Sequence, residues 1–581
     1  MRLRPTSGWA LAAAHLGATG ARPGYARAVS APKLPARIAE WTAGLLAVAA
    51  AVPVVRNFVE AMLQRRTYNG DIEWMEGGML VSAMRARDGL PLYGLPADDY
   101  IPFIYPPLHA WLLGALAHVY PLGYELGRTV SIVCTGVAAS ALVFGAVRAR
   151  GGWLLSLACV GLFASAWAAG GTFYDLVRTD SLSLALLGWA LVLGAEPSRG
   201  ATVASGLLLA VAFTAKQHAA ILGLPMLLAI WRSHGRLRAL QFAAASVGPA
   251  LLFVAAMSIS SGGTFLNWMV MVPAAHGQVA SRAFPGAPIL IWQALPISTS
   301  AVLLALPLWG RRPYWPGVTL TTLIVVALMR GHTGGFINVL IPAFWVSALL
   351  PAIAAGALAN RTELLPWARA AGALVVAAQL TSFQVDREAF STALAEGRSV
   401  PEAWQKAQHS LRRHVPTDSD RVAVGRVVEK IAALEGRVLV PYSPWYAVMA
   451  GKEPTFALIC LWDIDHKRGY YRPNVKEIEK SIAAEFDWAV LPNDKLGHGL
   501  KDHFTKSKTD KIPMSSTRAG WTVRLREVWQ RNPRTAGGAE TGAEKPVEPS
   551  ADQGEGQGDD QGGNDGGNPG DASGEDQGKP E

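Results

Sequence analysis

Long apolar segments, repeated along the first two thirds of the chain, constrain this sequence most. The first covers 38–59 and is almost wholly apolar apart from Glu40 and Arg56. About 20 residues of helix cross a ~30 Å hydrocarbon core, because an α-helix rises ~1.5 Å per residue. Further segments of the same kind, with the first, predict about eleven membrane-spanning helices: 127–147, 153–171, 179–195, 201–215, 218–231, 239–259, 289–309, 317–330, 336–356 and 366–384.

The positions of the basic residues predict how the chain crosses the membrane. Lys33 and Arg37 precede the first apolar segment, and Arg148, Arg232 and Arg311 follow later ones, always on the same side. Short cytoplasmic loops carry an excess of Lys and Arg. We therefore expect a multi-pass protein of the cytoplasmic membrane, with the N-terminus inside and everything after about residue 385 outside.

The composition agrees with a membrane protein that has no nucleic-acid partner. Half of the residues (50%) are hydrophobic and only 17% are charged. The net charge is +9, and basic loops that face anionic lipid headgroups account for such an excess. The three cysteines give no disulfide framework, because Cys134 and Cys159 fall inside predicted spans.

Changes in composition divide the chain into regions. The last region contains Gly, Asp, Glu, Gln, Asn and Pro with almost no apolar side chain, so it cannot bury enough surface to offset chain entropy and should be disordered. The expected regions are a cytoplasmic tail (1–37), a membrane domain (38–384) with a large outer loop (about 60–126), an outer domain (385–534) and an acidic tail (535–581).

The outer domain is predicted to mix helices and strands. Residues 437–442 and 486–491 are short apolar runs typical of buried strands, and 421–434 has the spacing of an amphipathic helix. The expected fold class is therefore a mainly α polytopic membrane protein with a small C-terminal α/β extracytoplasmic domain.

The large outer loop carries acidic residues at a predicted membrane face. Asp71, Glu73 and Glu76 follow the first span directly. Residues 76–86 have the pattern of an amphipathic helix at the interface, and the apolar run after Tyr105-Pro-Pro predicts a short helix that lies flat. A loop of this length predicts a folded unit rather than a simple connector.

The order of motifs in this region resembles the GT-C membrane glycosyltransferases, in particular the protein mannosyltransferase and aminoarabinose transferase branch. The motifs that carry the resemblance are Asp71-Ile-Glu73, Gly89-Leu-Pro-Leu-Tyr93, Tyr105-Pro-Pro-Leu-His-Ala-Trp-Leu112 and Arg128 at the opening of the second span. The resemblance covers about residues 40–260 well and the later spans in outline. It implies a polyprenyl-phosphate sugar as donor, a lipid, glycan or protein as acceptor, and transfer at the outer face of the membrane.

The resemblance also implies roles for individual residues. Asp71 matches the acidic base of the outer loop, with Glu73 or Glu76 as competitors, and Asp180 matches a second acidic residue near the fourth span. A partly desolvated carboxylate has a raised pKa, as a general base needs, and cations stabilise a departing phosphate. The remaining candidates are Lys216, Arg178 and Arg128 for the donor phosphate, and Tyr105, Asp175, His332 and Asn338 for substrate.

Each of these residues also has an ordinary structural interpretation. Asp71 follows Asn-Gly and fits a turn, Asp180 fits a helix N-cap, and Lys216 at a helix end fits a side chain that reaches for the interface. No cluster has the spacing of transition-metal ligands. A divalent cation held by Asp71 and Asp180 is an open alternative that no motif supports, so no cofactor is predicted.

Two other functions fit a multi-pass protein. A transporter or lipid-linked-sugar flippase would carry ionisable residues near the middle of its spans, whereas the charges here fall at the outer ends. A non-catalytic envelope scaffold would use the outer domain to bind cell-wall polymer. Replacement of Asp71 separates these functions from a transferase, because only the transferase needs the carboxylate.

Overall fold

A computed structural model describes most of the chain between residues 34 and 532. The described residues are 34–305, 314–358, 364–383, 387–400, 402–403, 411–466, 468–492, 503–520 and 523–532. The predicted acidic tail at 535–581 and nearly all of the predicted N-terminal tail lie outside the described residues.

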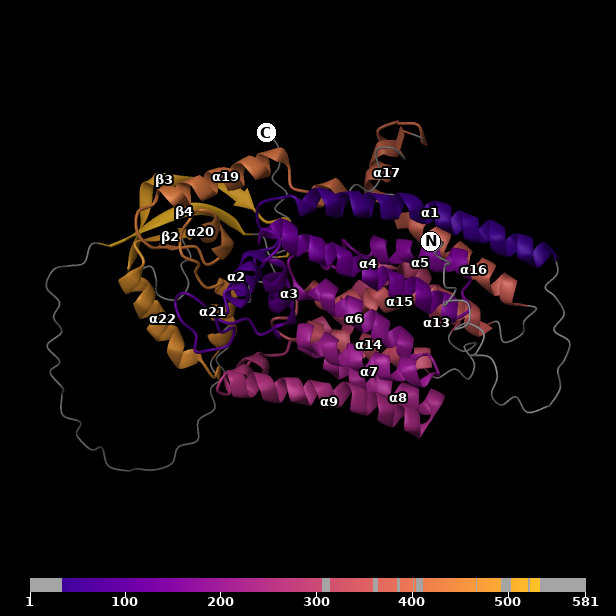
Figure 1. The fold of residues 1–581 in the computed structure, drawn as a ribbon. Helices are drawn as coiled ribbons and strands as arrows, with labels where there is room; N and C mark the ends of the chain where they lie inside the picture. Colours follow the sequence, from indigo (N-terminus) through magenta and orange to yellow (C-terminus); the bar gives the residue numbers. More distant parts are fainter. Residues whose placement is uncertain are drawn as a thin grey trace, which may run out of the picture.

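A bundle of apolar helices forms the larger part of the protein, and a smaller part with a β-sheet covers one end of it (Figure 1). Helix α1 packs on α5 and α16, and α6 packs on α4 and α7. The helices of the bundle are α1 (Leu34–Arg66), α4 (Tyr124–Arg148), α5 (Trp153–Ser165), α6 (Thr179–Gly194), α7 (Arg199–Ala215), α8 (Gly223–His234), α9 (Arg236–Ser260), α12 (Ala287–Ala294), α13 (Pro296–Ala305), α14 (Tyr314–Gly331), α15 (Ile341–Leu358) and α16 (Leu365–Phe383).

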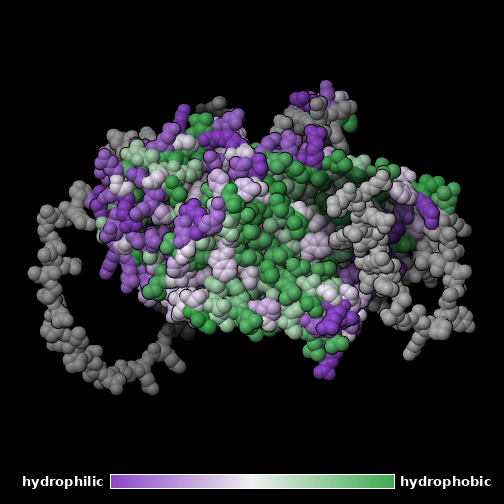
Figure 2. All heavy atoms as spheres, in the orientation of Figure 1, coloured by the Kyte–Doolittle hydropathy of each residue, from purple (hydrophilic) through white to green (hydrophobic). Residues whose placement is uncertain are grey.

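The bundle has the surface of a membrane protein. Figure 2 shows hydrophobic side chains over much of the bundle and hydrophilic ones over the smaller part. Within the described residues, four helical segments are long and apolar enough to cross a membrane by themselves, namely α1, α4, α9 and the segment Ile337–Leu358, and a bent pair raises the number to five. The predicted helices are thus present, but the predicted number of about eleven spans is not confirmed.

The bent pair explains one departure from the sequence prediction. A single span was expected at 289–309, yet α12 and α13 meet at an angle of 105°. Pro296 begins α13 and disfavours helical backbone in the residue before it, and Leu295 accordingly has φ −137° and ψ 56°. The proline therefore breaks the segment into two short helices.

Burial separates the centre of the bundle from its edge. Helix α15 is apolar on every face, and its spanning window is 100% buried, whereas that of α9 is 11% buried. A helix that is hydrophobic all round is stable only in a fully apolar environment. We therefore identify α15 as the centre of the bundle, with α9 at its edge.

Short helices connect the bundle to the smaller part. Helix α2 (Glu76–Arg87) packs on α3 (Leu108–Leu116), and both lie between the bundle and the sheet in Figure 1. The other short elements of the membrane part are η1 (Phe173–Asp175), η2 (Gln217–Leu222), α10 (Thr264–Leu266), η3 (Asn267–Met271), α11 (Val272–Ala274), η4 (Arg282–Gly286) and η6 (Ile337–Leu340).

The smaller part contains a four-stranded sheet with the strand order β1-β2-β4-β3. Strand β1 pairs parallel with β2, and β4 pairs antiparallel with both β2 and β3. The parallel pair and the helix α19 confirm the predicted α/β character, while β3 and β4 were not predicted. The elements are α17 (Arg387–Ala395), η7 (Leu411–His414), α19 (Asp418–Ala433), β1 (Val438–Leu439), α20 (Pro444–Met449), α21 (Leu458–Ile464), α22 (Arg472–Glu485), β2 (Trp488–Leu491), β3 (Phe504–Ser516) and β4 (Arg524–Arg531).

Helix α2 corrects a sequence prediction, because it does not lie at an exposed interface. All residues from Glu76 to Ala83 are buried. A Cβ atom on Gly78 would lie 2.7 Å from the Cβ of Ala457, and one on Gly77 would lie 3.1 Å from the backbone nitrogen of Trp445. The two glycines therefore let the smaller part pack directly on α2, next to the loop that carries Asp71 and Glu73.

Candidate functional site

Asp71 lies in the loop between α1 and α2, beneath helix α20. The hydroxyl of Tyr124 and the backbone N–H of Gly77 each donate to Oδ1 of Asp71 at 2.9 Å. The backbone N–H of Asp71 donates to the hydroxyl of Tyr446 on α20 at 3.1 Å. The candidate base is therefore held by groups from α4, α2 and the smaller part together.

Burial determines the acidity of Asp71. The side chain is 1% exposed, and desolvation, followed by the charge of Glu76, raises the pKa of Asp71 well above its usual range. Hydrogen bonds from Ser443 and Tyr124 oppose this shift. A carboxyl group with a raised pKa holds a proton more readily, as a general base requires.

Glu76 and Arg128 form a fully buried ion pair. The Nε and Nη2 atoms of Arg128 donate to the two carboxylate oxygens of Glu76 at 2.9 and 2.7 Å. Glu76 also accepts from the backbone nitrogen atoms of Ile72 and Val177. The charge of Arg128, followed by its hydrogen bonds and those from the backbone, lowers the pKa of Glu76 despite its burial. The remaining donors of Arg128 bind the backbone carbonyls of Arg65, Tyr68 and Gly70.

This pairing bears on two of the sequence predictions. Arg128 was predicted to bind the donor phosphate, but its guanidinium is 0% exposed and its donors are engaged within the protein. Glu76 was a competitor for the role of base, and Arg128 neutralises it. Arg128 and Glu76 therefore connect the end of α1 to α2 and hold the loop that carries Asp71.

Glu73 belongs to a second group of side chains, around Arg178. The Nη1 atom of Arg178 donates to Glu73 at 3.1 Å, and its Nη2 atom donates to the hydroxyl of Tyr105 at 3.1 Å. Burial raises the pKa of Glu73 to about 7, although Arg178 opposes the shift. Tyr105, a predicted substrate-binding residue, thus contacts the same guanidinium as Glu73.

Asp180, Lys216 and Asn338 meet next to this group. The Nζ atom of Lys216 donates to Oδ1 of Asp180 at 2.6 Å, and the side-chain amide of Asn338 donates to the same oxygen at 2.9 Å. Oδ2 of Asp180 lies 3.9 Å from Nε of Arg178. We call Glu73, Tyr105, Arg178, Asp180, Lys216 and Asn338 the Arg178 cluster; it joins residues that lie far apart in the sequence.

Like Asp71 and Arg128, the predicted residues Asp175 and His332 lie outside the Arg178 cluster. Asp175 pairs with Arg65 at 3.2 Å and accepts from the indole nitrogen of Trp167 at 3.2 Å, and both charged groups are 0% exposed. The ring of His332 contacts the ring of His276, with 4.9 Å between their centroids. Asp175 therefore pairs with the end of α1. His332 instead contacts His276 and the backbone carbonyl of Pro273.

The Arg178 cluster brings two cations and two carboxylates together. In the described part of the chain, no group of three or more His, Cys, Asp or Glu side chains could hold a metal ion. Arg178 and Lys216 are buried, and in this structure the carboxylates of Glu73 and Asp180 are their anionic partners.

Sequence reasoning missed residues that the smaller part supplies. The hydroxyl of Tyr446 accepts from the backbone N–H of Asp71 at 3.1 Å, and the backbone nitrogen atoms of Arg518 and Ala519 both donate to the carbonyl of Ile72 at 2.8 Å. These contacts join segments far apart in the sequence, so no local pattern encodes them. The smaller part thus supports the loop that carries Asp71.

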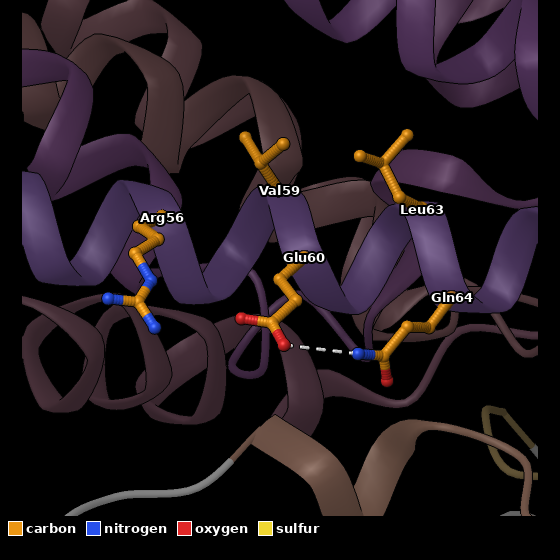
Figure 3. Close-up of a pocket in the computed structure, with 5 residues that line it drawn as sticks. All are labelled: Arg56, Val59, Glu60, Leu63 and Gln64. Atoms are coloured by element: carbon orange, nitrogen blue, oxygen red, sulfur yellow. Dashed lines mark hydrogen bonds between the residues drawn. The ribbon is translucent and has the colours of Figure 1, made fainter.

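A pocket on α1 lies apart from this site. Figure 3 shows that Arg56, Val59, Glu60, Leu63 and Gln64 line it from a single helix, with Gln64 donating to Glu60 at 3.2 Å. None of these residues is among the candidates. The candidate site is therefore defined by its buried polar cluster rather than by this pocket.

Comparisons with known proteins give a fold and no sequence family. No protein-family model matches the chain, and no curated protein sequence matches it. Among solved structures, ArnT from Cupriavidus metallidurans bound to undecaprenyl phosphate aligns with a TM-score of 0.53 and 14% identity over 84% of this chain and 98% of that one. The same protein in the apo state gives a TM-score of 0.51 with 14% identity over 84% and 97% of the two chains.

A further match is the apo oligosaccharyltransferase of Archaeoglobus fulgidus, with a TM-score of 0.38 and 10% identity over 83% of this chain and 76% of that one. The likeness to ArnT extends over nearly the whole of that protein. It confirms the GT-C fold expected from the sequence and, with the apolar helices, a multi-pass membrane protein.

Proposed function

We propose that this chain is a membrane glycosyltransferase that transfers a sugar from a polyprenyl-phosphate carrier to an acceptor at the outer face of the cytoplasmic membrane. One observation carries the proposal: Glu73, two residues after Asp71, gathers with Arg178, Asp180 and Lys216 in one buried cluster. The fold is shared with ArnT, which has been crystallised with undecaprenyl phosphate. In this proposal the N-terminus is cytoplasmic, and residues 385–534 form the outer domain.

The proposed reaction needs little beyond positioning and charge. A proton leaves the hydroxyl or amine of the acceptor for a carboxylate, and the freed electron pair attacks the anomeric carbon of the sugar. The bond between that carbon and the phosphate oxygen breaks, and the carrier phosphate departs with its electron pair. Arg178 and Lys216 would stabilise the charge that develops on this phosphate.

Asp71 remains our choice of base, and Glu73 is the competitor. Among the described residues, Arg128 is the cation whose charge acts on Asp71, and Arg128 is already paired with Glu76. Glu73 forms a direct pair with Arg178, which favours a role in holding that guanidinium. Asp180 would hold Lys216 in the same way.

The position of the charges favours a transferase over a transporter. Asp180 lies in the first turn of α6, Lys216 directly follows α7, and Arg128 lies near the start of α4. A transport pathway requires ionisable groups near the middle of the spans. Charges gathered at helix ends instead support chemistry at one membrane face.

Loss of a cation from the Arg178 cluster should weaken donor binding. Lys216→Met and Arg178→Met each keep an apolar stem and remove a charge, so we expect roughly ten-fold weaker affinity for undecaprenyl phosphate, the effect of one lost charge-assisted hydrogen bond. The measurement is binding of this lipid to purified protein in detergent. Lys476→Met is the matched control, because Lys476 is exposed on α22.

The proposed phosphate site would be refuted by unchanged lipid affinity in both Lys216→Met and Arg178→Met. A loss that also appears in Lys476→Met would point to a general effect of net charge. Melting temperatures measured on the same samples separate lost binding from lost folding.

A further inference from the structure

His109 is buried without a hydrogen bond. It is the second residue of α3 and is 1% exposed, and neither Nδ1 nor Nε2 has a hydrogen-bond partner among the residues that the structure describes. Buried polar groups are nearly always hydrogen-bonded, because an unpaired one loses its interactions with water and gains nothing in return. An imidazole with two unpaired nitrogen atoms therefore calls for a functional explanation.

The chain before His109 is anchored to the Arg178 cluster. The side-chain amide of Gln217, the residue after Lys216, donates to the carbonyl of Ile104 at 2.7 Å. The hydroxyl of Tyr105 accepts from Arg178 at 3.1 Å. His109 follows Tyr105 by four residues, and the charges of Arg178 and Asp180 act on its ring. The imidazole thus borders the proposed phosphate site.

The neighbouring polar atoms share this property. Nε of Arg178, Oδ2 of Asp180 and Nδ1 of His218 are also buried without a hydrogen bond in the described part of the chain. The potential donors among them, with the ring of His109, belong to the segments around 109, 178 and 218. One anion with several oxygen atoms could accept from more than one of them at once.

His109 is uncharged in this environment. Burial, followed by the positive charge of Arg178, lowers the pKa of His109 to about 4, while Asp180 acts in the opposite direction. A neutral imidazole still carries one N–H donor. It can therefore donate to an oxygen of an anion without adding a third cation to Arg178 and Lys216.

We propose that His109 is a third ligand of the donor phosphate, beside Arg178 and Lys216. Its ring N–H would donate to a phosphate oxygen. This inference rests on the proposed function, since it assigns the phosphate of the polyprenyl carrier to the Arg178 cluster. The bond would orient the leaving group before the transfer begins. It also explains why a buried position on α3 holds a histidine rather than an apolar residue.

Paired measurements of stability and affinity test the proposal. His109→Phe removes the N–H and leaves an apolar ring of similar shape, so the lipid-free protein should melt no lower than wild type, while its affinity for undecaprenyl phosphate should fall about ten-fold. His109→Gln keeps an N–H donor and should retain most of the affinity. His118→Phe is the matched control, because His118 is exposed beyond the end of α3, and it should change neither property.

A packing role for His109 predicts the opposite pattern, namely a lower melting temperature in His109→Phe with unchanged affinity in the folded fraction, and this result would overturn the proposal. His109→Leu provides the same comparison with a smaller side chain if phenylalanine does not fit. Wild-type affinity in both apolar variants would also overturn it. Failure of the wild type to bind the lipid would instead refute the proposed function, which separates the two cases.

Discussion

Asp71→Asn should reduce the rate of sugar transfer by about 10²–10⁴-fold, the loss expected when a general base is removed. Asparagine keeps the volume of the side chain and an oxygen that can accept from Tyr124 and Gly77. Expression and affinity for undecaprenyl phosphate should therefore stay close to wild type. The measurement is the initial rate of transfer by purified protein with saturating donor.

Comparison with Glu73→Gln and Asp88→Asn makes this result specific. Asp88 is exposed at the end of α2, so its substitution should leave the rate unchanged. A carboxylate base acts in its deprotonated form, so the rate should rise as pH rises through the pKa of the base. The pKa of Glu73 is about 7, and a rate that is half-maximal near that pH, with normal turnover in Asp71→Asn, would transfer the role to Glu73.

Arg128→Met should destabilise the protein by about 3–5 kcal/mol, the usual cost of leaving one partner of a buried ion pair uncompensated. Glu76 is 0% exposed and would lose both of its bonds to the guanidinium. The carbonyls at the end of α1 would lose their donors as well. The melting temperature in detergent should therefore fall clearly.

The double variant Glu76→Met/Arg128→Met should recover part of this loss, because it removes the unpaired charge together with its partner. Arg128→Lys keeps the charge but cannot make the paired contacts to Glu76, so its effect should be intermediate. An unchanged melting temperature in Arg128→Met, together with weaker binding of undecaprenyl phosphate, would contradict the positioning role. It would support the phosphate-binding role that the sequence predicts for Arg128.

Much of the fold could be predicted because the apolar segments are long. The apolar segments predicted helices at 127–147 and 239–259, and the structure has α4 and α9 there. Prediction was weaker where a single residue bends the chain, as at Pro296. It failed at β3 and β4, whose charged and polar sequences lack the alternation typical of a half-buried strand.

Sequence suggested individual site residues but not their pairs. Asp71, Glu73, Arg178 and Lys216 are candidates from their type and order along the chain, yet sequence could not show which cation meets which carboxylate. Ion pairs between distant segments depend on how the helices pack. The burial of α2 could have been suspected from Gly77-Gly78, since adjacent glycines in a helix suggest a close neighbour.

His109 illustrates the same limit. On sequence it belongs to a short apolar helix, where a histidine is typical of interfacial packing. Only the folded chain reveals that neither of its nitrogen atoms is hydrogen-bonded and that Arg178 lies nearby.

The most direct test of the central claim is transfer itself. Membranes that contain the wild-type chain, and matched membranes with Asp71→Asn, would be incubated with a panel of radiolabelled polyprenyl-phosphate sugars, and label leaving the carrier would be measured. We expect the wild type to transfer label from at least one donor to a membrane acceptor, and the variant to transfer at most about one hundredth as much. If no donor loses label to an acceptor, or if both membranes transfer label equally, the chain is not the glycosyltransferase proposed here.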